Sequence, residues 1–254
     1  MIIRALALIT ALMLGGTCWA REVVNVGGYQ FEPYVEFGDD GKPSGLAVDL
    51  IAEMNRHQDR YEFRFVPTSP RRRYKDFEDH KFDLVLFENP DWEWRQKGLP
   101  VETSQVILKG GDLYIALAMP GRTQSYFDDF TGRRVVGILG YHFGFAGFSS
   151  DPEVLTRKFN MTLVNDNAGC IGMILKGRAD LAMVTDHYLF RYLKRHPDAA
   201  AKLLISERYD QKYDLSVLMR RGGPVGVAEM NQLLTEMEAD GTLGRLWRAS
   251  GIAG

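Results

Sequence analysis

Strand-like and helix-like runs alternate along most of this chain, and the alternation restricts the fold more than any other feature. Three strand-like runs come first, at residues 23–29 (VVNVGGY), 61–66 (YEFRFV) and 82–88 (FDLVLFE). The stretches between them, residues 45–55 and 71–81, carry apolar side chains at helical spacing. Strands that alternate with helices predict an α/β fold with a mostly parallel sheet.

A second series of the same kind follows. Its strand-like runs lie at residues 112–119, 133–139, 161–164 and 179–185, with a helical stretch at 168–177. The tail then returns to a strand at residues 213–221 and to a helix, in which Met230, Leu233, Leu234 and Met237 recur at i, i+3, i+4 and i+7. The chain therefore predicts two α/β units and a returning tail.

Charge and motifs exclude several classes of function. The 31 basic and 33 acidic side chains give a net charge of −2, and acidic residues closely follow the one basic run, residues 71–73. We expect no nucleic-acid partner from this balance. The sequence has no GxSxG motif, no HExxH motif and no pair of cysteines spaced to bind a metal, and its five histidines are scattered. We therefore expect no metal and no cofactor.

The first twenty residues have the pattern of a secretory signal. Arg4 precedes an apolar stretch, residues 5–14, and small residues lead to Ala20. We expect a cleaved signal at residues 1–20 and a periplasmic protein; a lipid-attached protein is the alternative, although Thr17 precedes Cys18. Cleavage would leave Cys170 as the one thiol, and its apolar neighbours predict a buried structural residue.

Three stretches resemble the extracellular solute-binding proteins of the polar-amino-acid transporter family. They are residues 27–51 (GGYQFEPYVEFGDDGKPSGLAVDLI), 80–95 (HKFDLVLFENPDWEWR) and 230–251 (MNQLLTEMEADGTLGRLWRASG). The resemblance implies a two-lobed periplasmic-binding-protein fold of type II, in which two mixed sheets flanked by helices are joined by a two-strand hinge. Residues 21–113 and 214–254 would form lobe 1, residues 114–213 would form lobe 2, and a ligand would bind in the cleft that hinge motion closes.

The resemblance also assigns a carboxylate clamp in lobe 1. Asp83 begins the matching strand, and Arg95 falls at the position of the family's clamping arginine. A guanidinium suits this role because its planar fork makes two parallel hydrogen bonds to one carboxylate. The alternative is a surface arginine paired with Glu93 or Asp91.

The loop before Arg95 departs from the family pattern. Many relatives carry Ser and Thr where this chain has Phe87, Glu88 and Trp92 among residues 87–92. Glu88 either pairs with Arg95 or receives a cationic group of the ligand, with Trp92 or Trp94 adding a cation–π face. The alternative for the tryptophans is packing of the loop against the lobe.

Other site residues follow from the resemblance. In lobe 1 these are Phe31 and Tyr34, unless they are core residues, and Arg71 or Arg72. In lobe 2, the glycine-rich residues 137–148 follow a strand, which points to a polar contact from Tyr141 or His142. Asn165 or Asn167 adds a polar group. Asp186 resembles the family's ammonium acceptor, although it follows the strand one position later than in the commonest spacing of the family.

These observations predict a monomeric periplasmic binding protein for a small polar or zwitterionic solute, most simply an amino acid or an amine-bearing relative. Its partner would be an inner-membrane ABC permease. The carboxylate of Glu88 adds the hypothesis that the ligand carries a cationic group as well as any carboxylate. Two alternatives stay open: a periplasmic cyclohexadienyl dehydratase with Glu88 as its acid, and a sensor that docks on a membrane signalling receptor.

Overall fold

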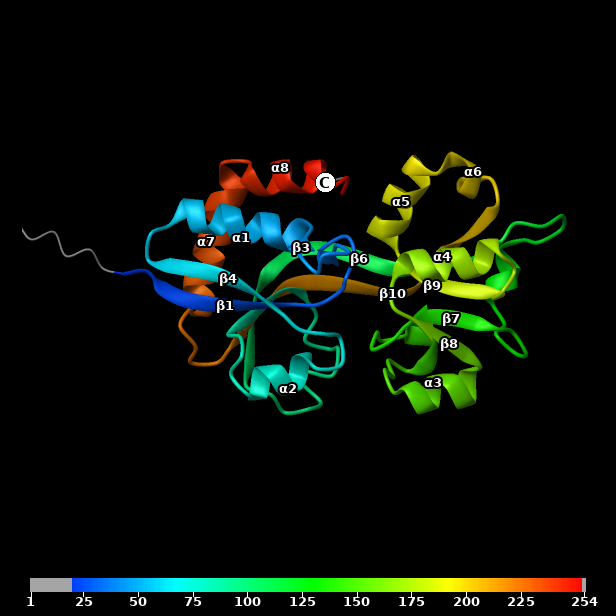
Figure 1. The fold of residues 1–254 in the computed structure, drawn as a ribbon, viewed down its shortest axis with the longest axis horizontal. Helices are drawn as coiled ribbons and strands as arrows, with labels where there is room; N and C mark the ends of the chain where they lie inside the picture. The colour runs from blue at the N-terminus through cyan, green and yellow to red at the C-terminus, as the bar shows by residue number, and fades with distance from the viewer. Residues whose placement is uncertain (1–19, 253–254) are drawn as a thin grey trace, which may run out of the picture.

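One eight-stranded sheet runs through the length of the molecule in the computed structural model, which describes residues 20–252 (Figure 1). In spatial order its strands are β4 (Tyr61–Pro67), β1 (Glu22–Gly28), β5 (Leu84–Glu88), β10 (Leu203–Arg220), β6 (Val101–Leu117), β9 (Leu181–Thr185), β7 (Val135–Ile138) and β8 (Met161–Val164). A two-stranded sheet, β2 (Glu36–Phe37) with β3 (Pro43–Ser44), lies apart from it. The predicted signal, residues 1–20, lies outside the described residues except for Ala20.

The two long central strands join the halves of the molecule. β6 and β10 pair antiparallel from Leu117 opposite Leu203 to Val101 opposite Arg220. Strands of this length span about 55 Å, which is enough to cross both halves. The prediction of a mostly parallel sheet holds at both ends, where β1 pairs with β4 and β5, and β7 with β8 and β9. At the centre β6 and β10 pair antiparallel with each other and with β9 and β5, so the sheet as a whole is mixed, as the resemblance implies.

Helices cover both faces of each half (Figure 1). The first half carries α1 (Leu46–His57), α2 (Arg73–Glu78), α7 (Val227–Ala239) and α8 (Thr242–Ala249). The second half carries α3 (Pro152–Phe159), α4 (Asn167–Leu175), α5 (Asp186–Arg195) and α6 (Pro197–Ala200). Helix α3 was not predicted, although Asp151 caps it by accepting the backbone N–H groups of Glu153 and Val154.

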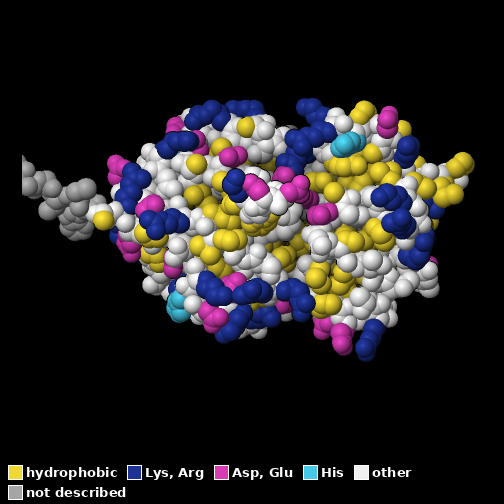
Figure 2. All heavy atoms as spheres, viewed as in Figure 1, with side chains coloured by type: hydrophobic (Ala, Val, Ile, Leu, Met, Phe, Trp, Pro, Cys, Tyr) yellow, Lys and Arg dark blue, Asp and Glu magenta, His cyan; other side chains and the backbone are white. Residues whose placement is uncertain are grey.

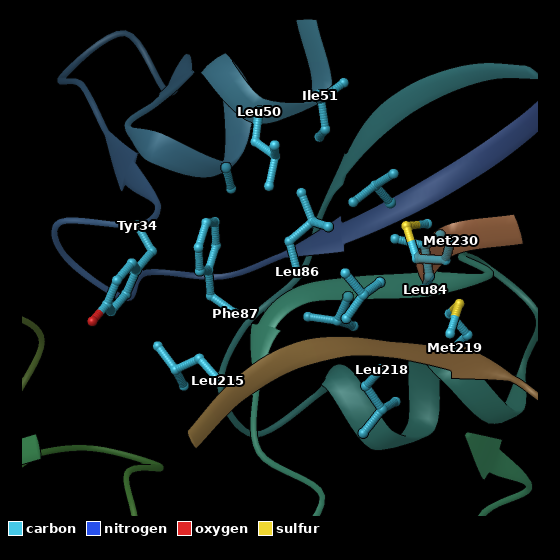
Figure 3. Close-up of a cluster of buried hydrophobic side chains, with 14 of the residues drawn as sticks. Tyr34, Leu50, Ile51, Leu84, Leu86, Phe87, Leu215, Leu218, Met219 and Met230 are labelled. Atoms are coloured by element: carbon cyan, nitrogen blue, oxygen red, sulfur yellow. The ribbon is translucent and has the colours of Figure 1, made fainter. Parts of the chain in front are cut away.

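Separate hydrophobic cores hold the two halves. The first core draws its buried side chains from residues 24–99 and 213–252, and Figure 3 shows Leu50 and Ile51 of α1 facing the sheet residues Leu86 and Leu84. Two further cores draw on residues 113–203, and they include the predicted buried thiol Cys170. The lobe boundaries at residues 113 and 214 stay a prediction.

Charges mix on the surface. Figure 2 shows Lys and Arg side chains interspersed with Asp and Glu over one face. Among residues 20–252, no helix combines the length and the apolar character that a bilayer span requires.

Candidate functional site

A small cavity lies where the two halves meet the crossing strands. Its walls come from the loop after β1, helix α2, the loops after β5 and β7, and strands β6 and β10. The lining residues are Tyr29, Phe31, Arg73, Trp92, Asp112, Gly140, Tyr141, His142, Gln211 and Tyr213. The free volume is about 20 Å³, close to the space that one water molecule needs. A larger guest therefore requires the halves to separate.

Aromatic rings form most of the wall. Phe31 lies at their centre, with its ring centre 6.1 Å from that of Tyr29, 5.6 Å from Trp92, 5.7 Å from Tyr141 and 6.3 Å from Tyr213. A tight turn holds Phe31 in place, because its backbone carbonyl accepts two N–H groups, from residues 34 and 35, at 2.8 and 2.9 Å. The faces of aromatic rings carry a negative electrostatic potential, and rings from both halves of the molecule line this cavity.

A buried ion pair stands behind one side of the wall. Arg73 Nε lies 3.5 Å from Glu88 Oε2, and both side chains are at most 1% exposed. Tyr29 Oη donates to Glu88 Oε2 at 2.9 Å, and the guanidinium carbon lies 4.7 Å from the Tyr29 ring centre and 4.4 Å from that of Tyr74. Burial raises the pKa of Glu88, and the Arg73 cation opposes that shift.

A second buried carboxyl, Asp112, faces the cavity from β6. It accepts Gln211 Nε2 at 2.8 Å and Thr185 Oγ1 at 3.2 Å, and both donors are neutral. Gln211 also accepts Trp92 Nε1 at 3.2 Å, so one amide connects the two halves. Burial, with a smaller contribution from Asp210, raises the pKa of Asp112 to about 7. Asp112 is thus poised between its neutral and ionised forms near neutral pH.

His142 presents a neutral imidazole. Its ring lies parallel to that of Trp92, at 5° and 6.2 Å between centres, and Nε2 lies 3.5 Å from Glu93 Oε1. Burial lowers the pKa of His142. The nearby His142 ring, with smaller contributions from Ser150 and Lys97, holds the pKa of Glu93 well below its usual range.

Polar contacts cross the cleft around the cavity. Tyr141 Oη donates to the carbonyl of Gln30 at 3.0 Å. The backbone and side-chain nitrogens of Asn167 both donate to Glu32 Oε2 at 3.3 Å, at the start of α4. Burial raises the pKa of Glu32 to about 7. These contacts hold the halves close together.

The structure brings four of the predicted site residues to the cavity: Phe31, Trp92, Tyr141 and His142. Glu88 is buried behind the wall and pairs with Arg73, so neither predicted role, a bond to Arg95 or to a ligand cation, describes its place. Tyr34 is a core residue that stacks on Phe87, at 5.1 Å between ring centres (Figure 3).

Tyr34 and Asp186 meet at a separate contact beside the cavity. Tyr34 Oη bonds to His187 Nδ1 at 2.8 Å, and Asp186 accepts the backbone N–H of His187 at 2.7 Å. Asp186 begins α5 and does not line the cavity; the residue before it, Thr185, donates its hydroxyl to Asp112.

Arg71 and Asn165 lie elsewhere. Both line an open depression of about 410 Å³ that shares no residue with the cavity. The buried arginine of the basic run is Arg73, because it lies on the face of α2 that carries Tyr74 and Phe77 inward. The four-residue spacing of Arg73 and Phe77 was the signal in the sequence.

Arg95 does not face the cavity. Its side chain is 66% exposed and pairs with Asp91, the surface alternative given above. The reason is its neighbour Trp94, which is fully buried with its ring centre 4.9 Å from Tyr74 and 5.4 Å from Phe77. Burial of Trp94 turns the next side chain outward. Sequence reasoning also missed Asp112, Gln211 and Tyr213, which stand in the polar stretches 109–112 (KGGD) and 207–214 (ERYDQKYD) of the crossing strands.

In the described part of the chain, no three or more His, Cys, Asp or Glu side chains lie together in a way that could hold a metal ion.

Comparisons with known proteins identify the family and the fold. The model of the bacterial extracellular solute-binding proteins, family 3, matches residues 24–249. A binding component of an ABC transporter from Wolinella succinogenes, solved with lysine, has a TM-score of 0.70 at 18% identity, covering 90% of this chain and 95% of its own. A substrate-binding protein of an ABC transporter from Streptococcus pneumoniae, solved with bound histidine, has a TM-score of 0.71 at 17% identity, covering 89% of this chain and 91% of its own.

A third solved structure bears on the enzyme alternative. It is an ancestral amino-acid-binding protein described as a precursor of cyclohexadienyl dehydratase, with a TM-score of 0.66 at 19% identity over 89% of this chain and 94% of its own. A search of curated proteins found no match. The solved structures confirm the predicted two-lobed fold of type II. Because the family model covers nearly the whole described chain, this protein belongs to the bacterial extracellular solute-binding proteins, family 3.

Proposed function

We propose that this protein captures a small solute with a cationic amino group in the cavity between its halves, in the periplasm, and presents it to an ABC importer. The observation that carries the proposal is Asp112, a buried carboxyl on the cavity wall whose hydrogen-bond donors are both neutral. An ammonium group would be a counterion for this carboxylate and would offset the free-energy cost of burying its charge.

The aromatic wall supports the same class of ligand. Cations bind over the faces of Trp, Tyr and Phe, with energies of about 0.5–2 kcal/mol for each ring. Phe31, Trp92 and Tyr213 place such rings beside Asp112. The related structures solved with lysine and histidine hold ligands that carry an amino group.

Ligand access requires motion. Binding pockets for small molecules measure about 300–1,000 Å³, far more than the closed cavity provides. The two halves share β6 and β10, so rotation about these strands is the simplest way to open it. The contacts from Tyr141 to Gln30 and from Asn167 to Glu32 would break in the open form.

A thermal-shift screen over amino acids, amines, carboxylates and sugars tests the proposal. At about 100 times its Kd, a ligand that binds only the folded protein adds about 2.7 kcal/mol of stability. We expect amino-group compounds to raise Tm, and Asp112→Asn to weaken their binding at least tenfold. Asp214→Asn is the matched control, because Asp214 is an exposed residue of β10 that pairs with Lys109. Tm shifts from sugars alone would contradict the proposal.

Catalysis ranks second. A dehydratase would need Glu88 as an acid beside its substrate, whereas Glu88 bonds to Tyr29 and lies outside the cavity lining. Incubation with prephenate or arogenate, followed by detection of an aromatic product, tests this alternative directly.

A further inference from the structure

Both arginines near the family's clamp position are already paired with carboxylates of this chain. Arg95 pairs with Asp91 on the surface, and Arg73 pairs with Glu88 in the interior. Among the described residues that line the cavity, Arg73 is the one Arg or Lys. His142 does not replace it as a cation, because burial lowers its pKa. A ligand carboxylate would therefore have to bind at Arg73.

The surroundings of Arg73 disfavour a second carboxylate. Its guanidinium lies against the rings of Tyr29 and Tyr74, and it donates through Nη1 to the carbonyl of Pro70. Glu88 Oε2 lies 3.5 Å from Nε and is fully buried. Another anion here would share one cation with Glu88 in a buried site, and two carboxylates in such a site repel each other strongly. Glu88 thus occupies the place that a ligand carboxylate would take.

The rest of the cavity favours a cation. Asp112 on β6 has Gln211 and Thr185 as its donors, and neither brings a charge. Around it stand ring faces from Phe31 and Trp92. When Asp112 is ionised, the charges at and directly behind the cavity wall are the balanced Arg73–Glu88 pair and the Asp112 carboxylate, so their sum is negative.

We infer that the ligand is a small amine without a carboxylate, in which the ammonium group binds Asp112 and the remaining carbon skeleton contacts the aromatic wall. The inference rests on the proposed function and narrows it: among amino-group compounds, those that lack the carboxylate bind best.

Matched pairs that differ only in the carboxylate provide the test: lysine and cadaverine, ornithine and putrescine, histidine and histamine, tyrosine and tyramine. We would measure the Kd of each compound by isothermal titration calorimetry with the mature chain at pH 8.0. At least one amine should bind, and it should bind at least tenfold more tightly than its amino acid. An amino acid that binds more tightly than its amine overturns the inference and leaves the proposed function standing. If neither compound of any pair binds, both are overturned.

Glu88→Gln tests the cause. Removing the Glu88 charge frees Arg73 for a ligand carboxylate, so the preference for the amine should fall at least tenfold. Glu62→Gln is the matched control, because Glu62 pairs with Arg64 on the surface of β4. An unchanged preference in folded Glu88→Gln protein overturns the inference. The pairs measured on the unaltered protein decide the ligand class even if this variant does not fold.

Discussion

Asp112 is the residue on which the chemistry of the cavity depends most. It is 4% exposed, and its carboxyl has hydrogen-bond donors but no cation among its bonded partners in the described structure. Desolvation penalises the charged form, which is why the pKa rises to about 7. A bound ammonium group would reverse this effect, since it stabilises the ionised carboxylate.

Binding of an amine should therefore depend on pH. Below pH 7 Asp112 is protonated in the free protein, and a cation must displace that proton. We predict that affinity falls by up to about tenfold for each pH unit below 7 and levels off above pH 8. Calorimetry from pH 5.5 to 8.5 measures this slope. Asp112→Asn should bind weakly with little dependence on pH, and an unchanged slope in that variant would assign the titration to another group.

The basic run and the clamp position show what residue patterns can and cannot predict. Phe31 and Trp92 were expected at the ligand because the resemblance to the family places the loops after the first and third strands at the cleft, and both line the cavity. Arg71 or Arg72 was expected at the cleft, although Arg73 is the buried member of the basic run. Which of three adjacent arginines turns inward depends on the orientation of α2 against the sheet, and that orientation is a tertiary property.

At the scale of elements, the turn at residues 89–98 decides where Arg95 points. Trp94 anchors this turn by filling a space beside Tyr74 and Phe77. The resemblance predicted Arg95 in the cleft because Arg95 falls at the position of the family's clamping arginine, although this loop lacks the small hydroxyl residues that many relatives carry. A large aromatic residue at position 94 competes for the interior, and burial of its surface outweighs the exposure of one arginine.

Substitutions of the adjacent residues Trp94 and Arg95 should differ greatly in their effect on stability. Trp94→Ala should lower the free energy of unfolding by about 3–5 kcal/mol, as for other buried tryptophans. Arg95→Ala should change it by less than about 1 kcal/mol, because an exposed ion pair contributes little. Urea unfolding followed by circular dichroism measures both. A large loss from Arg95→Ala alone would mean that Arg95 has a buried role that its exposure does not indicate.

Element boundaries were predictable where local signals are strong. The strand at residues 161–164 matches β8, and the helix predicted at 45–55 matches α1 within two residues. The outer halves of the crossing strands were not predicted. Residues 101–111 mix charged, polar and glycine residues, and they form a strand because pairing with β10 satisfies their backbone groups.

At the scale of the whole molecule, two carboxyls with raised pKa lie where the halves meet. Asp112 stands on a crossing strand, and Glu32 reaches from the first half to Asn167 of the second. The pKa of each is about 7 in the folded protein, whereas unfolded carboxyls titrate near pH 4. The folded state thus binds protons that the unfolded state does not, so the stability that these groups contribute is lost as pH rises through 7.

We therefore predict that the ligand-free protein gains stability between pH 8.0 and pH 6.5. The gain is about 1 kcal/mol for Asp112 and less for Glu32, which is only partly buried. The buried His142 and the partly buried His187 oppose it, since desolvation lowers their pKa. The double variant Glu32→Gln/Asp112→Asn keeps both histidines, so the difference between the two proteins isolates the carboxyls. Urea unfolding at the two pH values should show a gain about 1 kcal/mol larger in the unaltered protein. Equal gains would mean that neither carboxyl holds a proton where the halves meet, and the closed arrangement would then need another source of its stability.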